Sequence, residues 1–270
     1  MGSPMENFRV YLSLVMTSIR ARMEYKSSFI FYLVAIIFYY LGQVGLLLVL
    51  LAKFQTIHGW SLGEMAFLFG LLTFALGMSN FFFSSLINFD QMIINGDFDR
   101  YLVRPLSPLG QVMASKFEAS TLSHLLIGIA ALYAGSTMVD LDWTARKAAF
   151  FPLVVIGGVM ISGAIRLSVT AVAFWTLRNQ SLVHTIVFSS REFVIYPVSI
   201  YNFGVQFFLT FVFPLAFINF YPAHYFLDRA GDDLLHPALQ MGTPLVGVIL
   251  FSISLLIWKT GINHYQSSGS

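Results

Sequence analysis

The sequence is dominated by long apolar runs, and one of them, residues 29–52, contains no charged residue. An α-helix rises about 1.5 Å per residue, so about 20 apolar residues cross the roughly 30 Å hydrocarbon core of a bilayer. A helix is favoured there because it satisfies its own backbone hydrogen bonds. A mean hydropathy of +0.75 and a charged share of 10% fit this environment, whereas soluble domains carry about 25% charged residues. The sequence therefore predicts an all-α integral membrane protein.

Six runs are long enough to cross a membrane. The fourth contains Arg166, and the fifth contains Pro214, at which we expect it to bend or break. No loop is long enough to hold a soluble domain, so we expect one transmembrane domain over residues 1–270. The six expected spans are residues 29–52, 65–87, 119–139, 148–177, 200–221 and 241–258.

The distribution of lysine and arginine predicts the orientation, because cytoplasmic loops carry an excess of both. With both termini in the cytoplasm, ten basic residues lie inside and four outside, and Arg166 within a span completes the 15. The outer pair Arg146 and Lys147 opposes this orientation, but the inverted topology fits worse. The ten are Arg9, Arg20, Arg22, Lys26, Arg100, Arg104, Lys116, Arg178, Arg191 and Lys259, and the four are Lys53, Arg146, Lys147 and Arg229.

Residues 6–27 have the pattern of an amphipathic helix rather than of a span. Apolar residues recur at spacings of three and four, and Arg9 and Arg20 fall on the opposite side. Such a helix lies in the membrane interface with its basic side chains toward the headgroups. It serves either as an anchor or as a docking element, and this pattern does not predict a cleavable signal peptide.

Two segments near the C-terminal half are irregular. Arg191 and Glu192 make 178–199 a poor span, so we expect a short helix over 181–195 at the cytoplasmic boundary; the alternative is a seventh, broken span. Residues 222–240 combine prolines and aspartates with apolar pieces. Irregular backbone in a membrane protein must be buried in protein or wetted, so we expect a re-entrant or surface element on the outer side.

The segment NGDFDRYLVRPLSP, residues 95–108, is unusually charged and rich in proline for this chain. Gly96 permits a sharp turn, and Asp97 is placed to cap a short helix over 96–104. Pro105 ends that helix, and Ser107 followed by Pro108 is a good start for the next one. The pattern predicts a rigid turn that transmits force between a soluble partner and two spans. The alternative is an ordinary polar loop.

This segment resembles a run, G-x-F-D-x-x-L-x-R-P-L-S-P-L, that follows the second span in a poorly characterised bacterial branch of permease subunits of ABC type-2 exporters. FWTLRNQ (174–180), YPVSIY (196–201) and FPLAFINFYPAHYFL (213–227) are softer similarities, and the resemblance extends over essentially the whole chain. The matching residues are Gly96, Phe98, Asp99, Leu102, Arg104, Pro105, Leu106, Ser107, Pro108 and Leu109.

The resemblance implies that the chain is a permease subunit of an exporter in the bacterial cytoplasmic (inner) membrane. It implies two copies of a separate ABC ATPase, which bind ATP and Mg²⁺, and a second permease chain, identical or homologous. The chain has no GxxxxGK[ST] loop, so we expect no cofactor in it and no enzyme activity of its own. The residues implied to contact the ATPase are Gly96, Asp97, Phe98, Asp99, Leu102, Arg104, Pro105, Leu106 and Pro108.

Other classes of function explain less of the sequence. The chain has no cysteine, its six histidines lack metal-ligand spacing, and a net charge of +2 is too small to predict nucleic-acid binding. A membrane-embedded lipid-modifying enzyme needs paired acids, a Ser–His pair or a metal cluster within the spans. An ion-coupled carrier is expected to have more charged or broken spans and leaves the 95–108 segment unexplained.

Arg166 is the one charge expected deep inside a span. Ionisable residues there are costly and usually face the bundle interior or water, where they have a partner. Two explanations remain open. Arg166 either lines a transport path and meets an anionic headgroup, or pairs with Glu118 or Glu192 and holds helices together.

Overall fold

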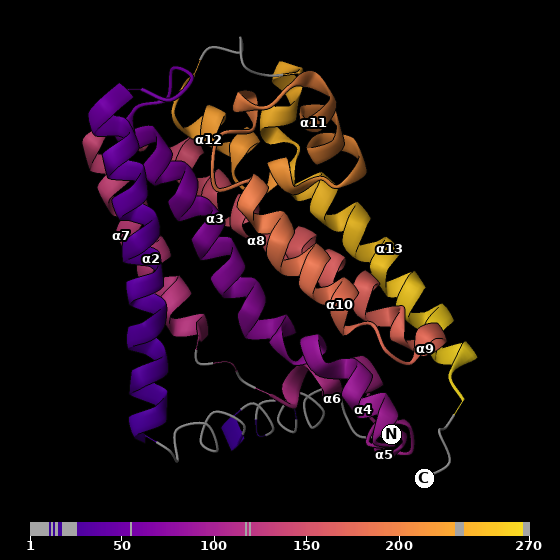
Figure 1. The fold of residues 1–270 in the computed structure, drawn as a ribbon. Helices are drawn as coiled ribbons and strands as arrows, with labels where there is room; N and C mark the ends of the chain where they lie inside the picture. The colour runs from indigo at the N-terminus through magenta and orange to yellow at the C-terminus, as the bar shows by residue number, and fades with distance from the viewer. Residues whose placement is uncertain are drawn as a thin grey trace.

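The computed structural model describes residues 11, 13, 16, 17, 26–54, 56–116, 118, 120–229 and 235–266. These residues form an all-helical bundle without a β-strand (Figure 1). The predicted all-α class is therefore confirmed for the described part of the chain. The five long helices are α2 (Lys26–Phe54), α3 (Leu62–Phe83), α7 (Ser120–Met138), α8 (Ala145–Ala171) and α13 (Thr243–His264).

The structure agrees in part with the six expected spans. Within the described residues, four helical stretches are long and apolar enough to cross a membrane, and a fifth is reached if one bent pair counts as a single span. The first expected span lies in α2, which contains the shorter apolar helical stretch Ile30–Gln43. The four stretches are Leu62–Ile94, Ser120–Met138, Ala145–Thr176 and Thr243–His264.

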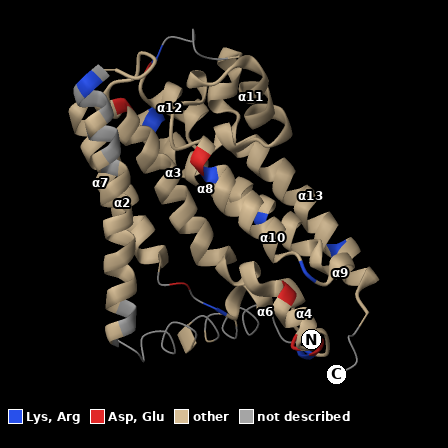
Figure 2. Ribbon diagram, viewed as in Figure 1, with Lys and Arg blue, Asp and Glu red and all other residues tan. Residues whose placement is uncertain are grey.

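The short helices gather at the two ends of the bundle (Figure 1). One end, called here the α5 end, carries α4, α5 and α6, the start of α2 and the close of α13; α11 and α12 lie at the opposite end. Charged residues are concentrated toward both ends (Figure 2). The α5-end helices are η1 (Ser84–Asn88), α4 (Phe89–Ile94), α5 (Asp99–Leu102), α6 (Pro108–Ala114) and α9 (Ala173–Thr176).

The helix α3 begins at a capping box at the opposite end. The Ser61 hydroxyl accepts from the Glu64 backbone N–H, and the Glu64 carboxylate accepts from the Ser61 N–H at 2.7 Å. This reciprocal pair satisfies two backbone donors that a helix start leaves free. At the other end α3 tightens into the 3₁₀ turn η1 and continues as α4, so the helical stretch reaches Ile94.

Glycines allow α3 and α7 to pack closely. A Cβ added at Gly128 in α7 would lie 2.6 Å from the backbone nitrogen of Phe74 in α3, and one added at Gly70 would lie 2.6 Å from that of Leu132. Both contacts involve backbone, so neither is relieved by moving a side chain. Close approach through small residues is a common way for membrane helices to associate.

We therefore expect Gly128→Ala to destabilise the protein by about 1–2 kcal/mol, because the cost of overpacking exceeds the gain in helix propensity. Thermal unfolding of the purified protein in detergent measures the effect. Gly42→Ala in α2 is the matched control, since a Cβ there meets nothing within 4 Å. Equal stability of the two variants would contradict close packing at Gly128.

The segment after α9 runs through the bundle instead of along its boundary. It comprises α10 (Gln180–Val183), the π-helical turn η2 (His184–Phe188) and the 3₁₀ turn η3 (Ser189–Phe193). Near its start, the Asn179 side-chain amide donates to Val169 O at 2.7 Å, close to the α5-end terminus of α8. Its far end, Val194, lies beside Leu68 of α3, because Asn219 donates to both carbonyls. The expected boundary helix over 181–195 is therefore placed wrongly.

The expected fifth span, 200–221, is a bent pair. Phe203–Val212 and Leu215–Phe226 meet at an angle of 77° around Pro214, where a bend was expected. The bend lies at the level of Gly158, whose Cβ position is 3.5 Å from Ile218, and the following Arg229 returns to Glu64 at the start of α3. The helices α11 and α12 of the two arms lie at the opposite end (Figure 1). The elements are η4 (Val198–Ile200), α11 (Phe203–Phe207), η5 (Phe208–Val212), η6 (Leu215–Phe217) and α12 (Phe220–Phe226).

This bent pair, called here the re-entrant hairpin, bears on two expectations. It begins about twenty residues before the expected element 222–240, and it is either a broken span over the expected 200–221 or a re-entrant loop. Proline explains the turn, because Pro214 cannot donate to a helical hydrogen bond and disfavours helix in the residue before it. Residues 230–234 of the expected element lie outside the described residues, and η8 (Pro237–Met241) leads into α13.

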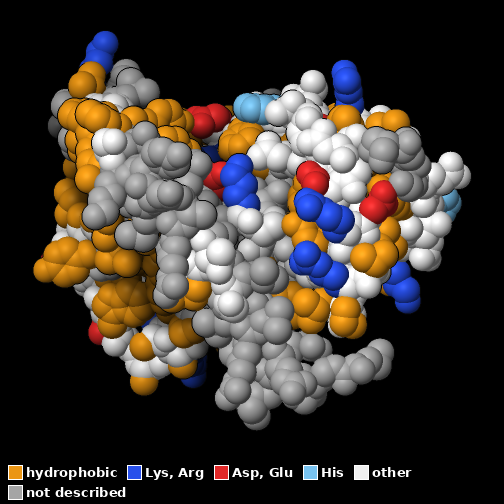
Figure 3. Space-filling view, turned by 90° about the horizontal axis from the view of Figure 1, so that it is seen from below, with side chains coloured by type: hydrophobic (Ala, Val, Ile, Leu, Met, Phe, Trp, Pro, Cys, Tyr) orange, Lys and Arg blue, Asp and Glu red, His pale blue; other side chains and the backbone are white. Residues whose placement is uncertain are grey.

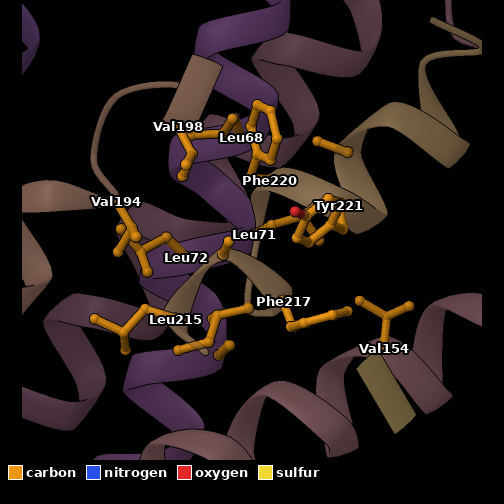
Figure 4. Close-up of a cluster of buried hydrophobic side chains, with 14 of the residues drawn as sticks. Leu68, Leu71, Leu72, Val154, Val194, Val198, Leu215, Phe217, Phe220 and Tyr221 are labelled. Carbon is orange, nitrogen blue, oxygen red and sulfur yellow. The ribbon is translucent and has the colours of Figure 1, made fainter. Parts of the chain in front are cut away.

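The hairpin is held by the main hydrophobic core. Figure 4 shows Leu68, Leu71 and Leu72 of α3 facing side chains of the hairpin and of the 194–198 segment, with Val154 of α8 nearby. All the side chains in this cluster are buried. The labelled hairpin members are Leu215, Phe217, Phe220 and Tyr221.

Candidate functional site

The 95–108 segment begins with a reversal of the chain after α4. Gly96 has a φ of +71°, a backbone conformation that glycine adopts without strain. The Gly96 N–H donates to Ile93 O at 3.1 Å, and the Phe98 N–H donates to Met92 O at 3.2 Å. These bonds turn the chain sharply back toward the bundle, in the way the sequence predicts for Gly96.

The short helix is smaller than expected and is capped differently. Sequence reasoning places a helix over 96–104 with Asp97 as its cap, whereas α5 covers Asp99–Leu102 and has no side-chain cap. The Asp97 carboxylate instead lies 2.5 Å from the Arg100 guanidinium in an exposed pair. The turn that follows Gly96 extends to Phe98, and this leaves Asp97 outside the capping position.

Phe98 anchors the segment in an aromatic cluster, defined here as Phe89, Phe98, Phe174, Trp258 and Tyr265. The Phe98 side chain is fully buried. Its ring centroid lies 5.1 Å from that of Phe89, 5.6 Å from that of Phe174 and 5.2 Å from that of Tyr265. Most pairs are edge-to-face, a preferred aromatic geometry. The cluster thus joins the segment to α4, α9 and α13.

A hydrogen bond reinforces this anchor. The Tyr265 hydroxyl, just beyond α13, donates to the Asp99 carboxylate at 2.9 Å. Burial, together with this hydrogen bond and the negative charge of Asp99, raises the pKa of Tyr265 to about 12. The hydroxyl therefore remains protonated at neutral pH and keeps donating to Asp99.

The second half of the segment is tied to α6. Gln111, which is buried, donates from its amide to Tyr101 O at 3.0 Å and to Leu106 O at 3.2 Å. Ser107 caps α6 by accepting from the Gly110 N–H at 3.4 Å, and Pro108 occupies the first turn. The predicted start of this helix at Ser107 and Pro108 agrees with the structure.

Between these anchors the segment presents an exposed tip, defined here as residues 102–105. Val103 is 84% exposed and Leu102 is 38% exposed, and Arg104 and Pro105 are also exposed. Seen from below, the α5 end shows basic and acidic side chains interspersed with apolar ones (Figure 3). An apolar tip flanked by charge on a rigid base is suited to contact a protein partner.

The other expected site residues have intermediate positions. Gly96, Asp97, Asp99, Leu106 and Pro108 are each half-buried beneath or beside the tip. Most of the expected interface helix 6–27 lies outside the described residues. Tyr11, which is described, contacts α6, since a Cβ at Gly110 would lie 2.9 Å from the Tyr11 ring.

Arg166 lies in the bundle, 5% exposed, without the expected acidic partner. Within the described residues, no salt bridge links it to Glu118 or Glu192, and Glu118 lies 3.0 Å from Lys116. The Nε and Nη1 atoms of Arg166 have no hydrogen-bond partner in the part of the chain that the structure describes. The pairing explanation is therefore wrong for this structure. Arg166 lines a cavity together with Arg191, a residue that sequence reasoning placed at the boundary.

The long apolar helices are those of a multi-pass membrane protein. Residues 33–269 match a family described as ABC-2 family transporter protein, which spans most of the chain. The protein belongs to this family and is a transmembrane permease of an ABC transporter. Permeases of this family generally work with an ATPase subunit. Neither a curated protein nor a solved structure gives a significant match.

Sequence reasoning missed the residues that support the segment. Gln111, Trp258 and Tyr265 were not singled out, although they fix its two halves. Phe174 stands in the FWTLRNQ similarity, and this was the one available signal that α9 belongs to the site. The other contacts join residues far apart in sequence, which no local pattern reveals.

Proposed function

We propose that this permease is an exporter subunit whose 95–108 segment is the coupling helix gripped by a separate ABC ATPase. The observation that carries this proposal is an exposed tip on a buried base. Val103 is 84% exposed, whereas Phe98, five residues earlier, is fully buried. A tip of this kind gives a partner something to grip, and the base connects it to the bundle.

The contacts of the base suggest how movement would pass into the membrane. A push on the tip acts on Phe98 and Asp99, and these touch Phe89 of α4, Phe174 of α9 and Tyr265 after α13. These elements continue directly into α3, α8 and α13. ATP-driven closure of two ATPases would therefore move three helices of each permease together. The proposed complex contains two permease chains, identical or homologous, and two ATPases.

Co-purification tests the coupling contact. The ATPase should be recovered with the wild-type chain in mild detergent, and Val103→Asp should reduce its recovery by at least about tenfold, since a charge replaces an apolar contact. Met241→Asp, an equally drastic change at an exposed residue of the opposite end, should leave recovery unchanged. Equal recovery with both variants would show that the tip does not hold the ATPase.

The proposed orientation places the α5 end in the cytoplasm. Basic residues at that end include Arg100, Arg104 and Lys116. At the opposite end, Lys147 lies 2.5 Å from Asp228 and Arg229 lies 2.6 Å from Glu64, so both of these basic residues are paired. The basic pair at 146–147 is the one objection to this orientation. The ion pair of Lys147 with Asp228 weakens that objection, because the aspartate offsets one of the two positive charges. We propose six crossings, with 180–194 as the fifth.

The chain contains no cysteine, so single cysteines report its orientation without background. In intact bacterial cells, a membrane-impermeant maleimide should label His236→Cys at the opposite end and leave Ser107→Cys at the α5 end unlabelled. Permeabilised cells should show labelling of both. The reverse pattern in intact cells would invert the topology and remove the 95–108 segment from any cytoplasmic ATPase.

A further inference from the structure

A cavity of about 430 Å³ lies in the half of the bundle nearer the α5 end. Its walls come from α2, α3 and η1, the start of α7, α8, and the η2–η3 segment. The wall residues that matter for its chemistry are Tyr39, Tyr40, Ser84, Glu118, Arg166 and Arg191. The cavity is separate from the 95–108 segment, because no residue of that segment lines it.

The charges around the cavity are predominantly positive. Arg166 and Arg191 both line it, and the guanidinium of Arg191 lies over the rings of Tyr39 and Tyr40, 6.0 and 5.2 Å from their centroids. One carboxylate, that of Glu118, also lines the cavity, but it lies 3.0 Å from the Lys116 ammonium. Two arginines that line one cavity repel each other and favour an anion between them.

Several residues that line the cavity carry buried hydrogen-bond donors without partners. Among the described residues, the Nε and Nη1 atoms of Arg166, the Nε and Nη2 atoms of Arg191, and the hydroxyl of Ser84 have no hydrogen-bond partner. Unmade hydrogen bonds of buried polar groups are costly, and most such groups in proteins are satisfied. A phosphate group offers several acceptor oxygens and matches guanidinium donors in geometry and charge.

The surface of α2 beside the cavity-lining residues is apolar and exposed. Phe31 and Phe38 are 75% and 68% exposed, and they flank the cavity-lining residues Tyr32 and Tyr39 along the same helix. Hydrocarbon chains attached to a bound phosphate would meet this apolar surface. A soluble phosphate compound would gain nothing from it.

We propose that this cavity binds the phosphate headgroup of a membrane amphiphile, with Arg166 and Arg191 as its principal ligands and the acyl chains along α2. The site follows from the cavity itself. Its use in transport rests on the proposed function, in which case anionic amphiphiles are the class of substrate that the permease moves.

Lipid binding to the complete purified chain tests the site. After delipidation, phosphatidic acid in mixed micelles should raise the thermal unfolding midpoint in a saturable way, whereas diacylglycerol with the same acyl chains should not. Arg166→Gln and Arg191→Gln should each weaken the affinity by about ten- to a hundredfold, the range expected for hydrogen bonds to a charged group. Arg178→Gln, which removes an exposed arginine outside the cavity, is the matched control.

Glu118→Gln should change the affinity in the opposite direction, because removing the cavity's carboxylate should strengthen the binding of phosphatidic acid. It keeps the proposal testable if Arg166→Gln fails to fold. Phosphatidic acid binding that is unaffected by all three cavity variants would overturn the site and leave the cavity as a water-filled space. Inorganic phosphate binding as tightly as phosphatidic acid would overturn the assignment to an amphiphile.

The role in transport has its own measurement. In the complex with the ATPase, phosphatidic acid should stimulate ATP hydrolysis several-fold, and Arg191→Gln should abolish the stimulation. Binding without stimulation would overturn the substrate assignment while leaving the lipid site intact. Failure to recover any ATPase would overturn the proposed function instead, and the binding result on the permease chain would still stand.

Discussion

Replacing Phe98 with alanine should abolish transport while the permease remains in the membrane. Phe98 is fully buried in the aromatic cluster, and truncation of a buried phenylalanine costs about 3–5 kcal/mol. That cost falls on the contacts between the 95–108 segment and α4, α9 and α13. The ATPase would still grip the exposed tip, but the tip would no longer be tied firmly to the bundle. The expected signature is ATP hydrolysis that persists without transport.

Two variants separate this effect from general damage. Phe98→Leu keeps most of the buried volume and should retain a substantial part of the transport activity. Val103→Ala trims the exposed tip and should leave stability unchanged, because Val103 has little packing to lose. Reconstituted vesicles containing both subunits allow ATP hydrolysis and transport to be measured together. Transport at the wild-type level in Phe98→Ala would rule out the aromatic cluster as the transmission element.

The fold could be predicted from the sequence for helices that have apolar surroundings, lipid or protein, along their whole length. The expected spans 65–87, 119–139, 148–177 and 241–258 each overlap a long helix, because a helix between lipid and protein needs apolar residues throughout. Residues 180–194 are different. This segment crosses much of the bundle while Arg191 points to an internal cavity, so its hydropathy resembles that of a boundary helix.

The re-entrant hairpin shows a second limit. Pro214 predicts a bend in 200–221, and the structure has one, but the bend angle decides whether the chain continues across the membrane or returns. That angle depends on partners distant in sequence, such as Thr243, whose hydroxyl donates to Phe217 O at 2.7 Å. The local sequence therefore predicts the bend at Pro214 but does not predict the direction that the chain takes after it.

The candidate site divides in the same way. Gly96, Ser107 and Pro108 act on the backbone within a few residues of themselves, so their roles could be predicted. The support from Gln111 and Tyr265 depends on tertiary contacts and could not. The fold also relates the two sites, since Arg166 lies about 12 Å along α8 and α9 from Phe174, which contacts Phe98. A movement of Phe174 would therefore reach the cavity through a short, mostly helical path.

Asn219→Ala should destabilise the protein by about 2–4 kcal/mol. Asn219 is fully buried where the re-entrant hairpin meets the bundle, and its amide donates to Val194 O at 2.7 Å and to Leu68 O at 3.4 Å. Removing the donor leaves buried carbonyls with fewer partners, at about 1–3 kcal/mol each, and also leaves a small void. The loss would loosen the hairpin from both α3 and the end of η3.

Asn202→Ala is the matched control for this prediction, because the Asn202 side chain caps α11 at the surface by accepting from the Val205 N–H at 3.1 Å. Loss of an exposed cap should cost only about 1 kcal/mol. Thermal unfolding of both variants in the same detergent gives the comparison, and Asn219→Asp, which cannot donate when ionised, should be at least as unstable as Asn219→Ala. If the two alanine variants unfolded at the same temperature, the hairpin would be held by its apolar contacts, and Asn219 would have no special part in fixing its turn toward the opposite end.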